Sequence, residues 1–184
     1  TRAAQNAGPG QVGGSPASPA GIDTSITRKP SKPVSVDTVT LRFVAVGGSE
    51  GAKFECSVDD GDFVECGSPL ALKGLQEGSH AVRVRAVSPD GQPDATPAEA
   101  IIVVDRTAPA TRVTGGPLGV RNERKISLIF DSSEVGSGFV CSVDESPLQA
   151  CAPGQGLSVG SDGRHVVRVY AIDAAGNRDP IGAE

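Results

Sequence analysis

The sequence repeats itself with an offset of 85 residues, and this duplication limits the possible folds more than any other feature. The segment FECSVDD at 54–60 aligns with FVCSVDE at 139–145. Between 51–94 and 136–179, sixteen of 44 aligned residues are identical without a gap. Because the two copies share one pattern, we expect two similar small domains in tandem.

Apolar residues in each copy recur at every second position, as in 41–45, 82–86 and 126–130. This period is typical of β-strands that have one face on a core and the other in water. Turn-forming pairs such as Asp60-Gly61 separate the segments at the short, regular spacing of a β-sandwich. The first copy is expected to form seven strands, near 24–27, 38–45, 53–59, 62–66, 70–73, 80–87 and 100–104. The sequence therefore predicts an all-β protein of two sandwiches.

The chain divides into three segments. Residues 1–21 are mostly Gly, Pro, Ala and Ser, with one charged and one sizeable apolar side chain, which predicts a flexible linker. The sandwiches are expected at 22–105 and 106–184. The first ends with the apolar run AIIVV, whereas Glu184 aligns with Glu99, so the second is expected to lack its last strand. Either the protein continues, or another chain donates that strand and completes the open edge.

Composition argues against several classes of protein. The net charge of −5 and the pI near 5.1 argue against a nucleic-acid partner, which needs a basic surface. No apolar run approaches the roughly 18 residues of a transmembrane segment. With five Phe, one Tyr and no Trp or Met, the cores should be small and rich in valine. A chain that begins with Thr1 and contains no Met is expected to be a processed product or an excerpt.

The four cysteines form two pairs with identical spacing, Cys56/Cys66 and Cys141/Cys151. Three pairings are formally possible, and the repeat symmetry selects one disulfide within each copy. A hairpin with a three-residue loop would set Cys56 opposite Cys66, within bridging distance. Each bridge should stabilise its domain by roughly 2–3 kcal/mol. Disulfides persist in oxidising surroundings, so an extracellular or cell-surface location is expected, with the periplasm as a further option.

Each copy also carries a Cys, Cys, His trio that zinc could bind, completed by His80 in the first copy and His165 in the second. Neither cysteine pair has the short spacing of familiar zinc sites, and each histidine follows a glycine turn. We therefore expect disulfides and structural histidines, with no metal ligand.

Acidic and amide side chains gather after the sixth expected strand of each copy and at the junction. Oxygen ligands near a junction could bind Ca²⁺ and stiffen a rod. We favour a tight turn in the segment DAAGN, with Asp173 capping it and Gly176 at positive φ, because no dense D-x-D-x-D run of calcium ligands is present. The residues concerned are Asp90, Asp94, Asp105, Asp173, Asn177 and Asp179.

The outward face of the sixth expected strand carries Arg83 and Arg85 in the first copy, and Arg168 and Tyr170 in the second. These side chains could meet an anionic glycan or a protein partner. We favour a solvated sheet face, on which long side chains lie along their neighbours.

The string FECSVDDGDFVEC, followed by GSHAVRVRAVSPDGQPD and IIVVDRTAPAT, resembles the tandem bacterial immunoglobulin-like (fibronectin-like) repeats of secreted and surface proteins. The second copy, with FVCSVDESPLQAC and GRHVVRVYAIDAAGNRDP, is similar. The resemblance covers about 22–184. It implies immunoglobulin-like sandwiches that serve in a stalk, an adhesin or an appendage, or as a module attached to a secreted enzyme, without activity of their own.

We therefore expect a non-enzymatic structural or adhesive segment of a bacterial extracellular or cell-surface protein, such as a stalk, spacer or filament subunit. The alternative is an accessory glycan- or peptide-binding module of a secreted enzyme. Expected partners are proteins, neighbouring domains or subunits, and a cell-surface glycan is a further candidate. No catalytic residue and no cofactor is predicted, because neither copy contains a recognisable catalytic motif. The predicted site residues are the disulfide cysteines Cys56, Cys66, Cys141 and Cys151.

Overall fold

The structure, a computed structural model, describes residues 21–47, 50–117 and 119–184. The expected linker at 1–21 lies, apart from Gly21, outside these residues. Within them the regular secondary structure is β-strand, and no helix is long and apolar enough to cross a membrane. The first sandwich contains β1 (Asp23–Arg28), β2 (Thr38–Val46), β3 (Lys53–Val58), β4 (Val64–Cys66), β5 (Leu70–Lys73), β6 (Gly78–Val87) and β7 (Ala98–Val104).

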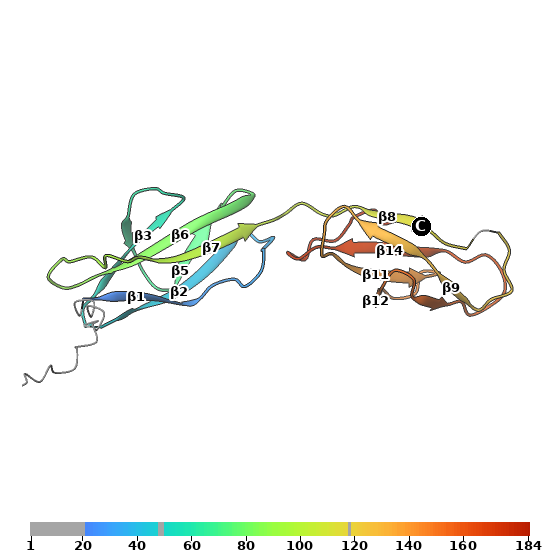
Figure 1. Cartoon of the computed structure of the whole chain (residues 1–184), viewed down its shortest axis with the longest axis horizontal. Coiled ribbons are helices and arrows are strands. Elements are labelled where there is room, and N and C mark those ends of the chain that lie inside the picture. The colour runs from blue at the N-terminus through green and yellow to red at the C-terminus, as the bar shows by residue number, and fades with distance from the viewer. Residues whose placement is uncertain (1–20, 48–49, 118) are drawn as a thin grey trace, which may run out of the picture.

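The first sandwich packs two antiparallel sheets face to face, with strand orders β1-β2-β5 and β4-β3-β6-β7 (Figure 1). All seven strands lie where the period-two pattern placed them. Alternate residues of β2, β6 and β7 point inward, and the most deeply buried include Leu41, Phe43, Val82 and Ile102. Phe43 meets Phe54 of the opposite sheet edge to face, with ring centroids 4.9 Å apart.

The second sandwich repeats this plan in β8 (Thr111–Gly115), β9 (Lys125–Ser127), β10 (Ile129–Ser132), β11 (Gly138–Val143), β12 (Gln149–Cys151), β13 (Gly156–Ser158) and β14 (Val167–Ile172). Here the equivalent of β2 is broken into β9 and β10 at Leu128. The Leu128 carbonyl accepts the N–H of Gly154 at 2.8 Å, outside any strand ladder. β10 pairs with β8, β9 pairs with β13, and β14 lies beside β11.

The two cores differ in size. Among the described residues, the main cluster of buried apolar side chains has ten members in the first sandwich and four in the second, namely Phe130, Cys141, Val167 and Val169. Upstream of 136 the two copies align with an offset of 87 residues, so Leu128 is the counterpart of Leu41. Leu41 is fully buried, but Leu128 is only partly covered. Burial of apolar surface is the main stabilising contribution in so small a domain, so the second sandwich should be the less stable of the two.

Disulfides join Cys56 to Cys66 and Cys141 to Cys151, with Cα atoms 5.8 and 5.9 Å apart. The expectation that Cys56 lies opposite Cys66 is wrong, because Cys56 faces Val64 and the bridge runs diagonally across the β3–β4 ladder. The reason is the turn: Asp59 and Asp60 both have positive φ and form a tight two-residue turn, and the residues after it shift the register. The same turn and the same diagonal recur in the second sandwich.

Candidate functional site

The proposed Cys, Cys, His trios do not form metal sites here, because each cysteine pair is oxidised and each histidine is engaged elsewhere. His80 Nδ1 lies 2.6 Å from Asp59 Oδ2, and its Nε2 lies 2.8 Å from the Gln76 carbonyl oxygen. His165 makes the equivalent pair with Asp144 and with the Ser161 carbonyl. Both nitrogens of each ring thus face an oxygen that can only accept a hydrogen bond, which favours the doubly protonated imidazolium.

These histidine–aspartate pairs hold the hairpin turn of each sandwich. Asp59 is in the left-handed region at φ 51°, and its second carboxylate oxygen accepts the Ala81 N–H at 3.0 Å. The hydrogen bond from His80 lowers the pKa of Asp59, and the same bond raises the pKa of His80. His165 and Asp144 shift in the same directions for the same reason. The same contacts to the turn occur in both copies.

A second arrangement that recurs in both copies is a buried aspartate that accepts a hydrogen bond from the first strand of its sandwich. Thr24 Oγ1 donates to Asp94 Oδ2 at 2.7 Å and accepts the Ala86 N–H at 2.8 Å. In the second sandwich Asp179 accepts the Thr111 N–H at 2.7 Å. Although burial raises the pKa of Asp179, hydrogen bonds from Gly182 and Thr111 lower it to about 2. Both carboxylates, which were candidate calcium ligands, accept hydrogen bonds from groups of their own sandwich.

The six residues between β7 and β8 form a joint that both sandwiches hold. From the first, Glu77 Oε2 accepts the Arg106 N–H at 3.2 Å, and Arg106 Nη2 donates to the Leu75 carbonyl at 3.1 Å. From the second, Asn177 Nδ2 donates to the Asp105 carbonyl oxygen at 2.9 Å. Pro109 is fully buried. The segment between the sandwiches is therefore bonded from both sides.

The turn at 173–177 shapes the second sandwich's half of this joint. Asp173 Oδ1 accepts the N–H groups of Gly176 and Asn177, and Gly176 has φ 95°, as expected for a tight turn. Asp173 Oδ2 accepts Asn177 Nδ2 at 2.7 Å, which orients the amide towards Asp105. Although burial raises the pKa of Asp173, these hydrogen bonds lower it below its usual value.

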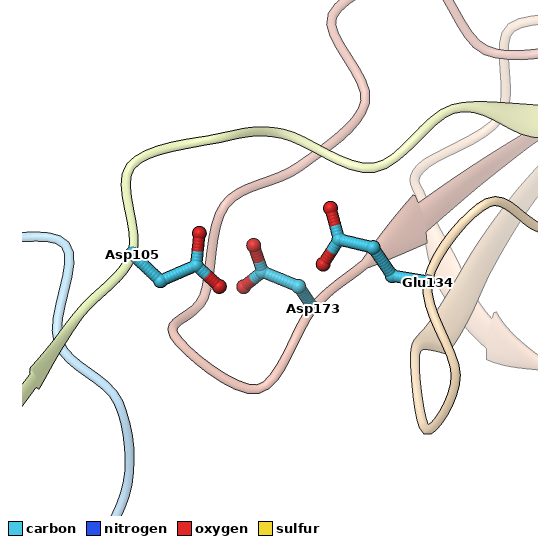
Figure 2. A group of neighbouring side chains, drawn as sticks. All are labelled: Asp105, Glu134 and Asp173. Carbon is cyan, nitrogen blue, oxygen red and sulfur yellow. The ribbon is translucent and has the colours of Figure 1, made fainter. Parts of the chain in front are cut away.

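Three carboxylates converge at the joint (Figure 2). Asp105 comes from the segment between β7 and β8, Asp173 from the turn at 173–177, and Glu134 from the loop after β10. Among the residues that the structure describes, this is the one group of three potential metal ligands, with an oxygen from each lying within 4.8 Å of the others. Asp173 is buried and the other two are half-buried. Burial and the negative charges of Asp105 and Asp173 raise the pKa of Glu134. Oxygen donors of this kind suit a hard cation such as Ca²⁺.

Sequence reasoning selected Asp105, Asp173 and Asn177, which the fold brings together, but it missed Glu134. A signal was available in the repeat: upstream of 136 the two copies align with an offset of 87 residues, which places Glu134 against Gly47, so its charge belongs to the second copy alone. Asp90 instead accepts a hydrogen bond from Ser88 in a surface turn of the first sandwich.

The arginines on the sheet faces are paired with carboxylates. Arg83 Nε lies 3.3 Å from Glu99, Arg85 Nη2 lies 2.7 Å from Glu55, and Arg168 Nε lies 2.7 Å from Glu184. The Arg85 guanidinium also stacks over the Phe63 ring at 4.1 Å. Tyr170 lies beneath the guanidinium of Arg178. These faces therefore carry a ladder of ion pairs in place of a free cationic stripe.

Neither a family model nor a curated protein matches the chain. Among solved structures, it is similar to the fibronectin(III)-like modules of Clostridium thermocellum CbhA, with a TM-score of 0.52 and 18% identity over 84% of this chain and 88% of that one. This likeness confirms the predicted all-β sandwich fold. A weaker likeness, with a TM-score of 0.34 and 18% identity over 88% of this chain and 46% of the other, is to Bacteroides ovatus mixed-linkage glucan utilization locus SGBP-B in complex with a mixed-linkage heptasaccharide.

Proposed function

We propose that this chain is a non-enzymatic spacer in a bacterial extracellular or cell-surface protein, in which two sandwiches are held end to end. One observation carries the proposal. The disulfide, the histidine–aspartate pair and the buried aspartate occur in both copies and serve each fold. Among the residues that the structure describes, by contrast, the acidic joint occurs once and connects the copies. The position of these unrepeated polar groups between the two sandwiches supports a role in holding the domains in a fixed relative orientation.

The cysteine chemistry supports the extracellular part of the proposal. All four cysteines of the sequence are in the two bridges, and none is free. Small domains with thin cores commonly depend on disulfides in secreted proteins, whereas reducing compartments keep thiols reduced.

The six-residue segment between β7 and β8 also supports the spacer role. It is short, buried at Pro109, and hydrogen-bonded to Glu77 on one side and to Asn177 on the other. A linker with such contacts restricts the angle between neighbouring domains, whereas a Gly/Ser linker of the same length would behave as a flexible coil. Figure 1 shows the resulting end-to-end arrangement of the sandwiches.

The test compares Asn177→Ala with Asn122→Ala, an exposed asparagine outside the joint and thus a matched control. Asn177→Ala removes the amide that connects the turn to the linker. We expect small-angle scattering of this variant to show a broader distribution of interdomain distances than wild type, while the control matches wild type. Equal distributions in all three proteins would contradict the spacer proposal, because the joint would not set the geometry.

The alternative, a glycan-binding accessory module, would need a surface that recognises sugars. The arginine stripe considered for that role is ion-paired. A glycan array probed with the full chain separates the two functions. We expect no saturable binding for a spacer, and dose-dependent binding to one sugar class would favour the alternative.

A further inference from the structure

Three Asp-Gly pairs occur in the sequence, at 60–61, 90–91 and 162–163. Aspartate followed by glycine can rearrange to isoaspartate, because glycine has no side chain to hinder the attack of its main-chain nitrogen on the aspartate carboxyl group. The reaction requires that this nitrogen be free to approach the carboxyl carbon. The three pairs differ in this respect in the structure.

The first two pairs are held by hydrogen bonds within their turns. The Gly61 N–H donates to the Val58 carbonyl oxygen at 3.0 Å, and the Gly91 N–H donates to the Ser88 carbonyl oxygen at 2.9 Å. Both aspartate carboxylates are also engaged, the first with an arginine and the second with a serine hydroxyl group. Rearrangement at these two places therefore requires that the turn open first.

The third pair lies in the loop between β13 and β14 and lacks these restraints. Among the residues that the structure describes, no group accepts the Gly163 N–H. The Asp162 side chain is 95% exposed, and its ion pair with Arg124, at 2.9 Å, lies at the surface, where such pairs are weak. Gly163 has φ 134°, and nothing lies within 4 Å of the place where a side chain would begin. The nitrogen and the carboxyl group are thus both accessible.

We propose that Asp162 is a modification site, at which the folded chain rearranges spontaneously to isoaspartate. The Gly163 nitrogen attacks Cγ of Asp162 and forms a C–N bond, and the nitrogen's proton and the carboxyl hydroxyl leave as one water molecule. Water then opens the resulting five-membered succinimide. Cleavage between the nitrogen and the original main-chain carbonyl carbon leaves the main chain running through Cβ and Cγ, with no change in mass. Cleavage of the new bond restores aspartate.

The repeat indicates that this reactivity belongs to the second sandwich. The 85-residue offset places Asp162 against Glu77, which is also followed by glycine. The same reaction of a glutamate needs a six-membered ring and is much slower. In the first sandwich, Glu77 accepts hydrogen bonds from Arg106 and Thr107 at the joint. The first copy therefore has a residue here that resists the rearrangement, and Asp162→Glu is a matched control.

The rearrangement would act on a loop whose two ends are fixed. His165 Nε2 lies 2.9 Å from the Ser161 carbonyl oxygen, and the Val166 N–H donates to Asp144 at 2.9 Å. Isoaspartate adds one atom to the main chain between Ser161 and His165, so the contact between these two residues should weaken. Modification should therefore destabilise the second sandwich and leave the first unchanged. This inference goes beyond the spacer role and does not depend on it.

The experiment incubates the folded full chain for several weeks at physiological temperature and maps isoaspartate by peptide mass spectrometry. We expect isoaspartate to accumulate at 162 at least about threefold faster than at 60 or 90, because the amides of Gly61 and Gly91 must first lose a hydrogen bond. The control is the same chain unfolded in guanidinium chloride with its disulfides reduced. All three glycine nitrogens are free in that state, so the three rates should be comparable.

A second readout follows the stability of the modified sandwich. Tyr170 is the sole tyrosine and the sequence has no tryptophan, so intrinsic fluorescence reports on the second sandwich. We expect the Tm of this transition to fall by about 3 °C or more in the modified molecules, and to stay unchanged when the Asp162→Glu variant is incubated in the same way.

Equal rates at the three sites of the folded chain would overturn the proposal, because the fold would then not select Asp162. The same preference for 162 in the unfolded chain would also overturn it, because the selection would then come from the neighbouring sequence. An equal loss of Tm in the incubated Asp162→Glu variant would overturn the destabilisation by isoaspartate.

Discussion

Removal of the two disulfides one at a time should have unequal consequences, although the bridges are alike. Each closes a loop between cysteines ten residues apart. Because loop closure restricts the unfolded chain, each bridge should contribute about 2.7 kcal/mol at 25 °C. The main buried cluster of the second sandwich has four members where that of the first has ten, so the same loss is a larger share of its stability. We expect the second sandwich to be largely unfolded without its bridge and the first to remain folded.

The assay compares Cys56→Ala/Cys66→Ala with Cys141→Ala/Cys151→Ala by urea unfolding. Far-ultraviolet circular dichroism follows both sandwiches, and Tyr170 fluorescence follows the second. With a slope of about 1–2 kcal/mol per molar urea, the midpoint of the first sandwich should fall by more than about 1 M without its bridge, whereas the second sandwich without its bridge should have lost most of its folded signal before urea is added. Wild type treated with a reductant keeps its sulfur atoms, so it separates loss of the bridge from loss of core packing. Midpoints unchanged by removal of either bridge, or a larger loss of structure in the first sandwich, would refute this reasoning.

Two further predictions concern charged groups. Since the pKa of His80 is raised, its pair with Asp59 stabilises the fold fully below about pH 6.5 and loses that effect as the pH rises through the raised pKa. Because the pKa of Asp59 is lowered, the pair also loses its stabilising effect as the pH falls below about 3.8. The Tm of the first sandwich should therefore be highest between about pH 3.8 and about pH 6.5. In the His80→Gln variant, this Tm should fall less steeply as the pH rises above that range. Glu134→Gln should raise Tm at pH 7 in a chelating buffer, because the mutual repulsion with Asp105 and Asp173 is removed. The gain should shrink as the pH falls and wild-type Glu134 becomes protonated, and a lower Tm for this variant at pH 7 would contradict the argument.

The sandwich fold could be predicted from the sequence because its determinants are local and occur twice. The period-two pattern places each strand of the first sandwich, and the duplicated cysteine spacing indicates the two bridges that the structure contains. The register between β3 and β4 could not be predicted. The register depends on the left-handed backbone conformation of Asp59 and Asp60. Aspartate tolerates this conformation but does not require it, so the sequence alone does not predict it.

The joint was only partly predictable, because its residues come from segments far apart in the sequence. Asp105 and Asp173 stand out as acidic residues near turns, but Glu134 meets Asp173 only because the loops after β10 and β14 lie side by side, and Asp105 comes near both from the segment between the sandwiches. The partners of His80 were equally hidden: Asp59 lies 21 residues earlier and reaches the ring only because β3 and β6 pair in this register.

The central claim is that the joint fixes the two sandwiches as one body, and residual dipolar couplings measured on both sandwiches of the full chain test it most directly. If the joint holds the sandwiches as one body, couplings from β1–β7 and from β8–β14 will fit a single alignment tensor with the sandwiches oriented as in Figure 1. Two tensors of different magnitude, one for each sandwich, would show that the sandwiches reorient independently and would contradict the account.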